Sequence, residues 1–175
     1  MKKELSIILP IFNERDSLPI MVRLLDSSIN FKKEIIIVYD SENDNAIDVA
    51  KDLANELEDV KLVHNKIAPG VRFAVESGVN KANYDIILIT AVDEIFPIIA
   101  IDKMISHLIK HDLDFLSGTR YSKGGIRLGG SIVGSIFSRV ANNLFKLFTN
   151  IPLSDCTTGI KMMKKNVWQS ITLNS

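Results

Sequence analysis

Short apolar runs alternate with helical patterns along the first two thirds of the chain. The runs are rich in Ile, Leu and Val, and they predict strands at residues 4–10, 34–39, 60–64, 85–90 and 115–119. Runs that are apolar at every position suit strands of a parallel sheet whose two faces are both covered. The pattern therefore predicts a buried, mainly parallel sheet.

Amphipathic segments lie between these runs. Residues 46–57, 71–82 and 101–109 carry apolar side chains at helical spacing, and the second of these stripes is narrow and made of small residues that suit close packing. Asp44 precedes the first segment and is predicted to cap it. This β-α-β-α order predicts an α/β fold, doubly wound, with helices on both faces of the sheet and ligands at the carboxyl ends of the strands.

A broader apolar helical face runs from Val133 to Phe148. It follows a stretch with four glycines, Ser122–Gly130, which is predicted to be a mobile loop. Two interpretations of the helix stay open. It could be buried on the sheet, which is the commoner arrangement, or its apolar face could meet a membrane or another domain.

Composition narrows the class of protein. A chain of 175 residues fits one domain, and a formal net charge of zero gives no electrostatic footprint for nucleic acid. Cys156 is the only cysteine, so no intrachain disulfide can form and a cytoplasmic location is favoured. No apolar stretch reaches the length of a membrane span, so a membrane contact of this chain is expected to be peripheral. The signatures of dinucleotide binding and of a serine nucleophile are absent from the sequence.

Polar residues follow three of the predicted strands. They occupy residues 10–14, 39–44 and 91–94, and all three groups include carboxylates. Each group alone would be read as a turn or a helix cap. Because the carboxyl ends of parallel strands share one edge of a sheet, the three groups together could hold a cation and, through it, a diphosphate.

Six segments, in this order, resemble family-2 glycosyltransferases, and in particular the dolichol-phosphate mannosyltransferase group. The segments are SIILPIFNE at 6–14, VYDSENDNA at 38–46, GVRFA at 70–74, TAVDEIFP at 90–97, SGTRY at 117–121 with Gly124 and Gly125, and DCTTG at 155–159 after Ser138, Arg139 and Asn142. The resemblance runs from about Leu5 to Met163. It implies a single catalytic domain over 1–175, and because relatives continue further, we expect the natural protein to extend beyond Ser175.

The resemblance implies a GT-A fold and a hexosyltransferase that moves a sugar, with inversion, from a nucleotide-diphosphate sugar to a polyprenyl phosphate such as dolichyl or undecaprenyl phosphate. It places such an enzyme in cell-envelope glycan biosynthesis, on the cytoplasmic side and at the inner face of a membrane. The nucleotide-sugar-binding residues that it implies are Pro10, Phe12, Asn13, Glu14, Asp40, Gly70 and Arg72.

The same resemblance assigns Asp93 to a divalent cation, Mg or Mn, which would stabilise the leaving diphosphate. Ala91 stands where the family has the first carboxylate of its Asp-x-Asp motif, and Arg72 stands where a glycine is common. These departures put the metal site in question.

On the acceptor side, the resemblance implies Arg120, Arg127, Ser138 and Arg139 as phosphate-binding residues. Arg120 is the strongest candidate, because the planar fork of guanidinium matches a phosphate. Asp155 is counted with Asp93 and Arg120 among the catalytic residues and is expected to position a loop or an arginine. An ordinary salt bridge between Arg120 and Asp155 is the competing interpretation, and both could hold together.

Two other functions remain as alternatives. One is a catalytically silent homologue that binds a nucleotide sugar or a lipid phosphate within a complex. The other is a nucleotidyltransferase, which would need a glycine-rich, basic loop after the first strand. Residues 12–15, FNER, do not provide such a loop.

Overall fold

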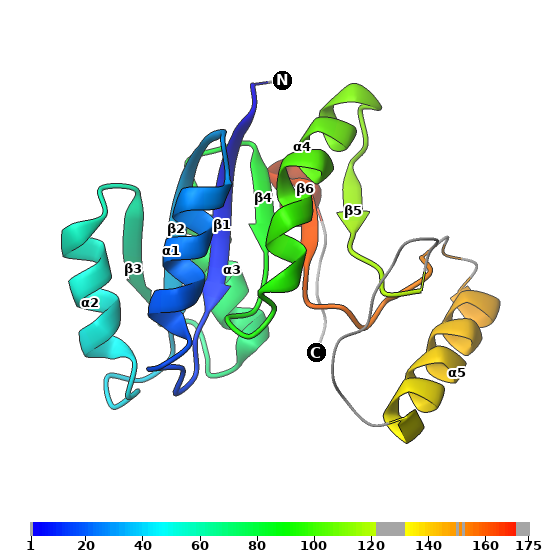
Figure 1. The fold of residues 1–175 in the computed structure, drawn as a ribbon, viewed down its shortest axis with the longest axis horizontal. Helices are drawn as coiled ribbons and strands as arrows, with labels where there is room; N and C mark the ends of the chain where they lie inside the picture. The colour runs from blue at the N-terminus through cyan, green and yellow to red at the C-terminus, as the bar shows by residue number, and fades with distance from the viewer. Residues whose placement is uncertain (1, 122–131, 150, 152, 171–175) are drawn as a thin grey trace.

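The fold is a six-stranded sheet covered by helices (Figure 1). The structure is a computed structural model that describes residues 2–121, 132–149, 151 and 153–170. The strand order across the sheet is β3-β2-β1-β4-β6-β5. The strands are β1 (Glu4–Pro10), β2 (Lys32–Tyr39), β3 (Val60–His64), β4 (Ile86–Ile89), β5 (Phe115–Ser117) and β6 (Lys161–Lys164).

Four of the strands are parallel, and β6 reverses the direction. β1 pairs with β2 and β4 in parallel, and β2 pairs with β3 in the same sense. β6 runs antiparallel to both β4 and β5, with Lys161 opposite Ile89. The first residue of β6 therefore lies at the same edge of the sheet as the carboxyl ends of β1, β2, β3 and β4.

The helices divide between the two faces of the sheet. They are α1 (Leu18–Ser28), α2 (Ile47–Glu56), α3 (Val71–Lys81), the short 3-10 helix η1 (Phe96–Ala100), α4 (Ile101–Lys110), α5 (Ile132–Thr149) and α6 (Lys165–Ser170). Apolar side chains of α1, α2 and α4 join one buried cluster, while α3 and Trp168 of α6 join the other. The expected doubly wound arrangement is confirmed.

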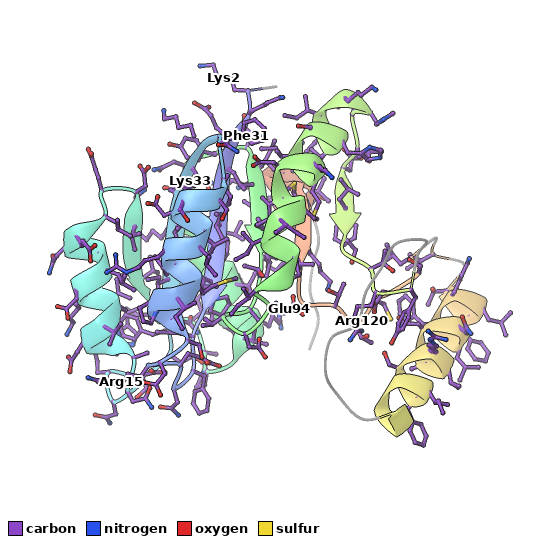
Figure 2. The ribbon with its side chains drawn as sticks, in the orientation of Figure 1. Lys2, Arg15, Phe31, Lys33, Glu94 and Arg120 are labelled. Carbon is purple, nitrogen blue, oxygen red and sulfur yellow. The ribbon has the colours of Figure 1, made fainter. Side chains whose placement is uncertain are left out.

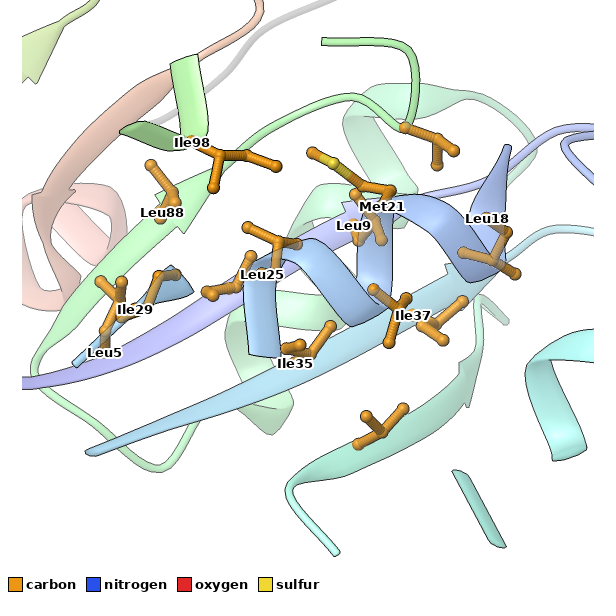
Figure 3. Close-up of a cluster of buried hydrophobic side chains, with 14 of the residues drawn as sticks. Leu5, Leu9, Leu18, Met21, Leu25, Ile29, Ile35, Ile37, Leu88 and Ile98 are labelled. Atoms are coloured by element: carbon orange, nitrogen blue, oxygen red, sulfur yellow. The ribbon is translucent and has the colours of Figure 1, made fainter. Parts of the chain in front are cut away.

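The larger core lies between α1 and the central strands (Figure 3). Leu18, Met21 and Leu25 of α1 pack over alternating residues of β1 and β2, and all are inaccessible to water. Burying a side chain of this size stabilises the fold by about 1.5–3 kcal/mol. On the other face, a Cβ at Gly78 would lie 2.5 Å from a methyl group of Ile8. The small-residue stripe of α3 thus allows the close packing that the sequence predicts.

The five predicted strands are all present, although β4 and β5 are shorter than expected. The three predicted helices that lie between these strands are present as well. Asp44 does not occupy the position directly before α2, which belongs to Ala46. Its carboxylate instead accepts hydrogen bonds from the backbone N–H groups of Ala46, at 2.8 Å, and of Asn13, at 2.9 Å.

The interpretation of the helix at 133–148 as buried on the sheet is wrong. Figure 1 shows α5 standing apart from the sheet. Phe137, Leu147 and Phe148 are 70%, 75% and 81% exposed. The polar side chains of Ser138 and Asn142 contact the rest of the domain instead. The predicted loop at 122–130, with Arg127, lies outside the described residues.

Candidate active site

The loops after β1 and β2 are joined by hydrogen bonds. Asn13 has a φ of 58°, a left-handed conformation that asparagine adopts more readily than most residues. This conformation directs its N–H to the carboxylate of Asp44, while its side-chain oxygen accepts a hydrogen bond from the N–H of Asn45 at 3.4 Å. Phe12, the preceding residue, is 76% exposed. The two strand ends therefore form one connected rim with an exposed aromatic ring.

Asp40 organises the neighbouring loop between β3 and α3. One oxygen of its carboxylate accepts a hydrogen bond from the side chain of Asn65, and the other accepts one from the N–H of Gly70, both at 2.7 Å. Gly70 has a φ of 117°, which side chains disfavour. Asn65 is itself buried and accepts a hydrogen bond from Ser77. Asp40 thus fixes the start of α3, where Arg72 lies.

The predicted donor residues gather at one edge of the sheet. Pro10 is the last residue of β1, and the carbonyl group of Glu14 accepts the N–H of Leu18 at the start of α1. Arg72 lies in the first turn of α3, with its guanidinium carbon 4.8 Å from the ring centroid of Phe73. These positions place the predicted nucleotide-sugar residues on loops after β1, β2 and β3.

The loop after β4 offers few groups that could hold a cation. Asp93 is exposed, and Ala91 has no ligand atom. Glu94 directs one carboxylate oxygen to the N–H of Gly159 at 2.9 Å, while its other oxygen and the hydroxyl of Thr90 are buried without a hydrogen-bond partner. Within the described part of the chain, no group of three or more His, Cys, Asp or Glu side chains is arranged to hold a metal ion. The residues present therefore do not fit a cation held by the protein alone.

The guanidinium of Arg120 forms a bidentate salt bridge with the carboxylate of Asp155. Nε donates to one oxygen at 2.7 Å, and an Nη donates to the other at 2.9 Å. Asp155 is fully buried, whereas the side chain of Arg120 is 30% exposed. Burial opposes ionisation of Asp155, but hydrogen bonds from Arg120 and Thr157 outweigh it and hold the pKa of Asp155 well below its usual value. The predicted salt bridge is confirmed, and Asp155 is ionised at neutral pH.

Hydroxyl groups and a second arginine surround this pair. Arg120 also donates to the hydroxyl of Thr157, which lies 3.4 Å from that of Ser138. The hydroxyl of Tyr121 donates to Ser138 at 2.8 Å. The guanidinium carbons of Arg120 and Arg139 each lie 5.4 Å from the ring centroid of Tyr121. Three of the four predicted acceptor residues thus converge, and Arg127 lies outside the described residues.

Sequence reasoning placed Glu94 in the group at 91–94 that could hold a cation, and it gave no site role to Lys161. Figure 2 shows Glu94 at the lower end of the sheet, with Arg120 across from it on the side of α5. Lys161, the first residue of β6, is partly buried, and both Glu94 and Asp155 act on its charge. In the sequence, Lys161 looks like an ordinary solvated lysine at the end of a strand. Only the pairing of β6 with β4 shows that it lies at this edge of the sheet.

The chain is similar in sequence to proteins of known activity. The model of glycosyl transferase family 2 matches residues 6–172. Dolichol-phosphate mannosyltransferase of Pyrococcus furiosus is 26% identical over 98% of this chain and 49% of its own length. Undecaprenyl-phosphate 4-deoxy-4-formamido-L-arabinose transferase of Yersinia enterocolitica is 29% identical over 97% of this chain and 51% of its own. The chain spans about half the length of the curated relatives it matches.

Solved structures share the fold. A mannosyltransferase of Pyrobaculum calidifontis in complex with GDP-Man and Mn²⁺ superimposes with a TM-score of 0.68 at 15% identity, over 94% of this chain and 45% of that one. Glucosyl-3-phosphoglycerate synthase of Mycobacterium tuberculosis, with Mn²⁺, UDP and phosphoglyceric acid, gives 0.70 at 14% identity, over 96% and 58%. The GT-A fold is thereby confirmed. With its family model matched over nearly all of its length, the chain belongs to glycosyl transferase family 2.

Proposed function

We propose that this chain transfers a sugar, with inversion, from a nucleotide-diphosphate sugar to a polyprenyl phosphate. Family membership and the activities of the relatives support the reaction class. The observation that carries the acceptor is the Arg120–Asp155 pair, because a buried carboxylate holds a partly exposed guanidinium in a fixed orientation. Arg139 and the hydroxyls of Ser138 and Thr157 complete a site whose chemistry suits a phosphate monoester.

The donor is proposed to lie across the loops after β1, β2 and β3. Phe12 offers an exposed ring, and Asp40 holds the loop that begins α3. We place the nucleoside here, among Pro10, Phe12, Asn13, Glu14, Asp40, Gly70 and Arg72, with its diphosphate directed to the end of β4. Asp40→Ala should weaken donor binding with or without a metal, because it releases Gly70 and the loop before it.

The acceptor phosphate attacks the anomeric carbon of the sugar. One bond forms between a phosphate oxygen and that carbon, and the bond from the carbon to the diphosphate breaks, so that the nucleoside diphosphate leaves with the electron pair. A phosphate monoester is already anionic near neutral pH and needs no strong base. It needs alignment, which Arg120 provides. Asp155 stays ionised and hydrogen-bonded, so its role is to position Arg120.

Two solved relatives of this fold hold Mn²⁺ beside a nucleotide, and a divalent cation, Mg or Mn, is the expected cofactor of the class. In this chain Asp93 is the residue proposed for it from the sequence, and this assignment stays a prediction. Since the residues at the end of β4 do not fit a cation held by the protein, no step above depends on one.

The exposed face of α5 is proposed to contact the membrane that holds the lipid acceptor. Phe137, Val140, Leu144, Leu147 and Phe148 project from one side of the helix, opposite Ser138 and Asn142. None of the helices described here is both long and apolar enough to cross a bilayer. A peripheral contact through α5, on the cytoplasmic side, would bring the acceptor to Arg120.

The experiment is transfer of radiolabelled sugar from UDP-, GDP- and dTDP-sugars to a short polyprenyl phosphate, with donor binding measured by calorimetry. Arg120→Lys keeps the charge but loses the bidentate bond to Asp155 that orients it, so it should lower turnover with little change in donor affinity. Arg23→Lys is the matched control, since Arg23 makes a similar forked pair with Glu56 on the exposed surface. Donor binding without any transfer would identify a silent homologue instead.

A further inference from the structure

The residues at the end of β4 are an unusual set for binding the negative charge of a leaving diphosphate. Ala91 replaces a carboxylate, and Asp93 is exposed. Glu94 is engaged with Gly159 through one of its oxygens. A cation bound here would have at most two carboxylates from this loop. Another residue would therefore have to supply the positive charge that balances the diphosphate.

Lys161 lies at this place because β6 runs antiparallel to β4. Its backbone is opposite Ile89, the last residue of β4, two positions before Ala91. Residues opposite each other in a sheet lie on the same face, so the side chain of Lys161 lies beside that of Ile89, directly before the loop that begins at Thr90. The ammonium group donates to the carbonyl oxygen of Thr158, directly before Gly159. Lys161 thus belongs to the segment that Glu94 holds.

The ammonium of Lys161 remains available for a ligand. An ammonium has three N–H donors, and among the described residues its only hydrogen bond is the one to Thr158. No carboxylate of the described residues lies within ion-pair distance of it. Asp155 is already neutralised by Arg120.

The charges around Lys161 keep it suited to an anion. Burial lowers the pKa of Lys161 overall, while the negative charges of Glu94 and Asp155 act in the opposite direction. Glu94 therefore favours the charged ammonium from beyond contact distance. A diphosphate that approached Lys161 would supply the full counter-charge that the partly buried ammonium lacks.

We propose that Lys161 supplies the positive charge that binds the leaving diphosphate, in place of a divalent cation. Lysine is a compact point charge that binds phosphate without a fixed geometry. This inference rests on the proposed function, since it concerns the diphosphate of the same donor. It predicts that donor binding does not depend on a divalent metal. Asp93 would then have no role in holding one.

The test uses calorimetry on metal-stripped protein, with UDP, GDP, UMP and GMP as probes, in excess chelator and again in Mn²⁺. The wild-type chain should bind a nucleoside diphosphate in chelator within about threefold of its affinity in Mn²⁺. Lys161→Ala should weaken binding of the diphosphate by about tenfold or more, and that of the monophosphate much less. Lys161→Arg should restore most of the diphosphate affinity.

Lys165→Ala is the matched control, because Lys165 also donates to a backbone carbonyl, that of Ala82, but at the far end of β6. It should leave nucleotide affinity unchanged. Binding that appears only with Mn²⁺ would overturn the inference and leave the proposed function intact, as would an unaltered diphosphate affinity in Lys161→Ala. If the wild-type chain bound no nucleotide in either condition, both would be overturned.

Discussion

The carboxylate of Glu94 accepts a hydrogen bond from the backbone N–H of Gly159 over 2.9 Å. This bond joins the loop after β4, on the side proposed for the donor, to the segment that carries Asp155, on the side proposed for the acceptor. A Cβ at position 159 would lie 2.9 Å from the same carboxylate. Glycine is therefore needed here because of a close approach between two segments. The two halves of the candidate site are held in register by a contact that involves neither substrate.

Removing either partner of this hydrogen bond should destabilise the fold by a similar amount. Gly159→Ala pushes the carboxylate away, and Glu94→Ala removes it, so each should lower the free energy of unfolding by about 1.5–3 kcal/mol, as for a hydrogen bond to a charged group. The double variant should lose little more than either single one, because both remove one interaction. Urea denaturation measures all three, and Glu94→Gln, which keeps an acceptor, is the control. Fully additive losses would show that the two residues are not coupled.

The Arg120–Asp155 pair should stabilise the fold as well as the site. Arg120→Leu leaves Asp155 buried and unpaired, so it should cost about 3 kcal/mol at pH 7. The pKa of Asp155 is lowered in the folded chain. Its contribution is therefore fully present above the unfolded value of about 3.9, and it is lost as the pH falls from there through the folded pKa. Urea denaturation at pH 7, 5 and 3 should show the gap between wild type and variant narrowing as the pH falls, because protonation of Asp155 removes the unpaired buried charge from the variant. A gap that stays constant down to pH 3 would contradict this account.

The sequence predicts the sheet well because β1, β2 and β4 are buried on both faces and read as continuous apolar runs. It does not reveal β6, since KMMK places two apolar residues between two lysines, a pattern that also suits a helix or a loop. That omission hides the site role proposed for Lys161, because only the pairing of β6 with β4 brings Lys161 to the carboxyl ends of the parallel strands. The salt bridge of Arg120 with Asp155 could be predicted, since the two motifs follow one another in the family pattern.

The exposure of α5 could not be decided from periodicity. An apolar helical face looks the same whether it packs on a sheet or faces water. Ser138 and Asn142 show which face of α5 points inward only once their partners, Tyr121 and Cys156, are known to lie on the inner side.

Similarly, Asp44 follows the pattern of a helix cap, but its bond to Asn13 depends on the distance between two strand ends that the chain order does not specify.

Glu34 is a buried carboxylate that we assign to stability and not to the site. It accepts hydrogen bonds from Ser6 and Lys61, each at 2.5 Å, and from the N–H of Asn83 at 2.6 Å. Burial opposes its ionisation, but these donors lower the pKa of Glu34 overall. It pairs in register with Ser6 near the start of β1, at the edge of the sheet opposite the strand carboxyl ends.

Glu34→Ala should therefore destabilise the fold without affecting ligands. Removing the carboxylate leaves four donors without their acceptor, since the side-chain amide of Asn83 also donates to it at 3.0 Å, and this should cost about 3 kcal/mol. Nucleotide affinity, measured by calorimetry well below the melting temperature, should stay at the wild-type value. Ser6→Ala removes one donor and should cost about 1 kcal/mol. An altered nucleotide affinity in Glu34→Ala would show that the two edges of the sheet are coupled.

The exposed face of α5 gives the prediction that bears most directly on how a lipid acceptor would reach the site. Leu147 and Phe148 are largely exposed, so replacing either by Asp removes no packing and should leave the melting temperature within about 2 °C. At a membrane the same change would place a charge where apolar side chains enter the headgroup region. Co-sedimentation with vesicles that contain anionic lipids should therefore fall several-fold for Leu147→Asp and Phe148→Asp.

The matched control is Asn55→Asp, which adds the same charge on the exposed surface of α2. It should bind vesicles like the wild type, because α2 lies on the sheet and has no exposed apolar stripe of this kind. Transfer to a water-soluble short-chain phosphate should be unchanged in the α5 variants, while transfer to a long-chain acceptor in vesicles should fall with binding. If the α5 variants bind vesicles as well as Asn55→Asp does, then this face meets something other than a membrane, and another domain becomes the better assignment.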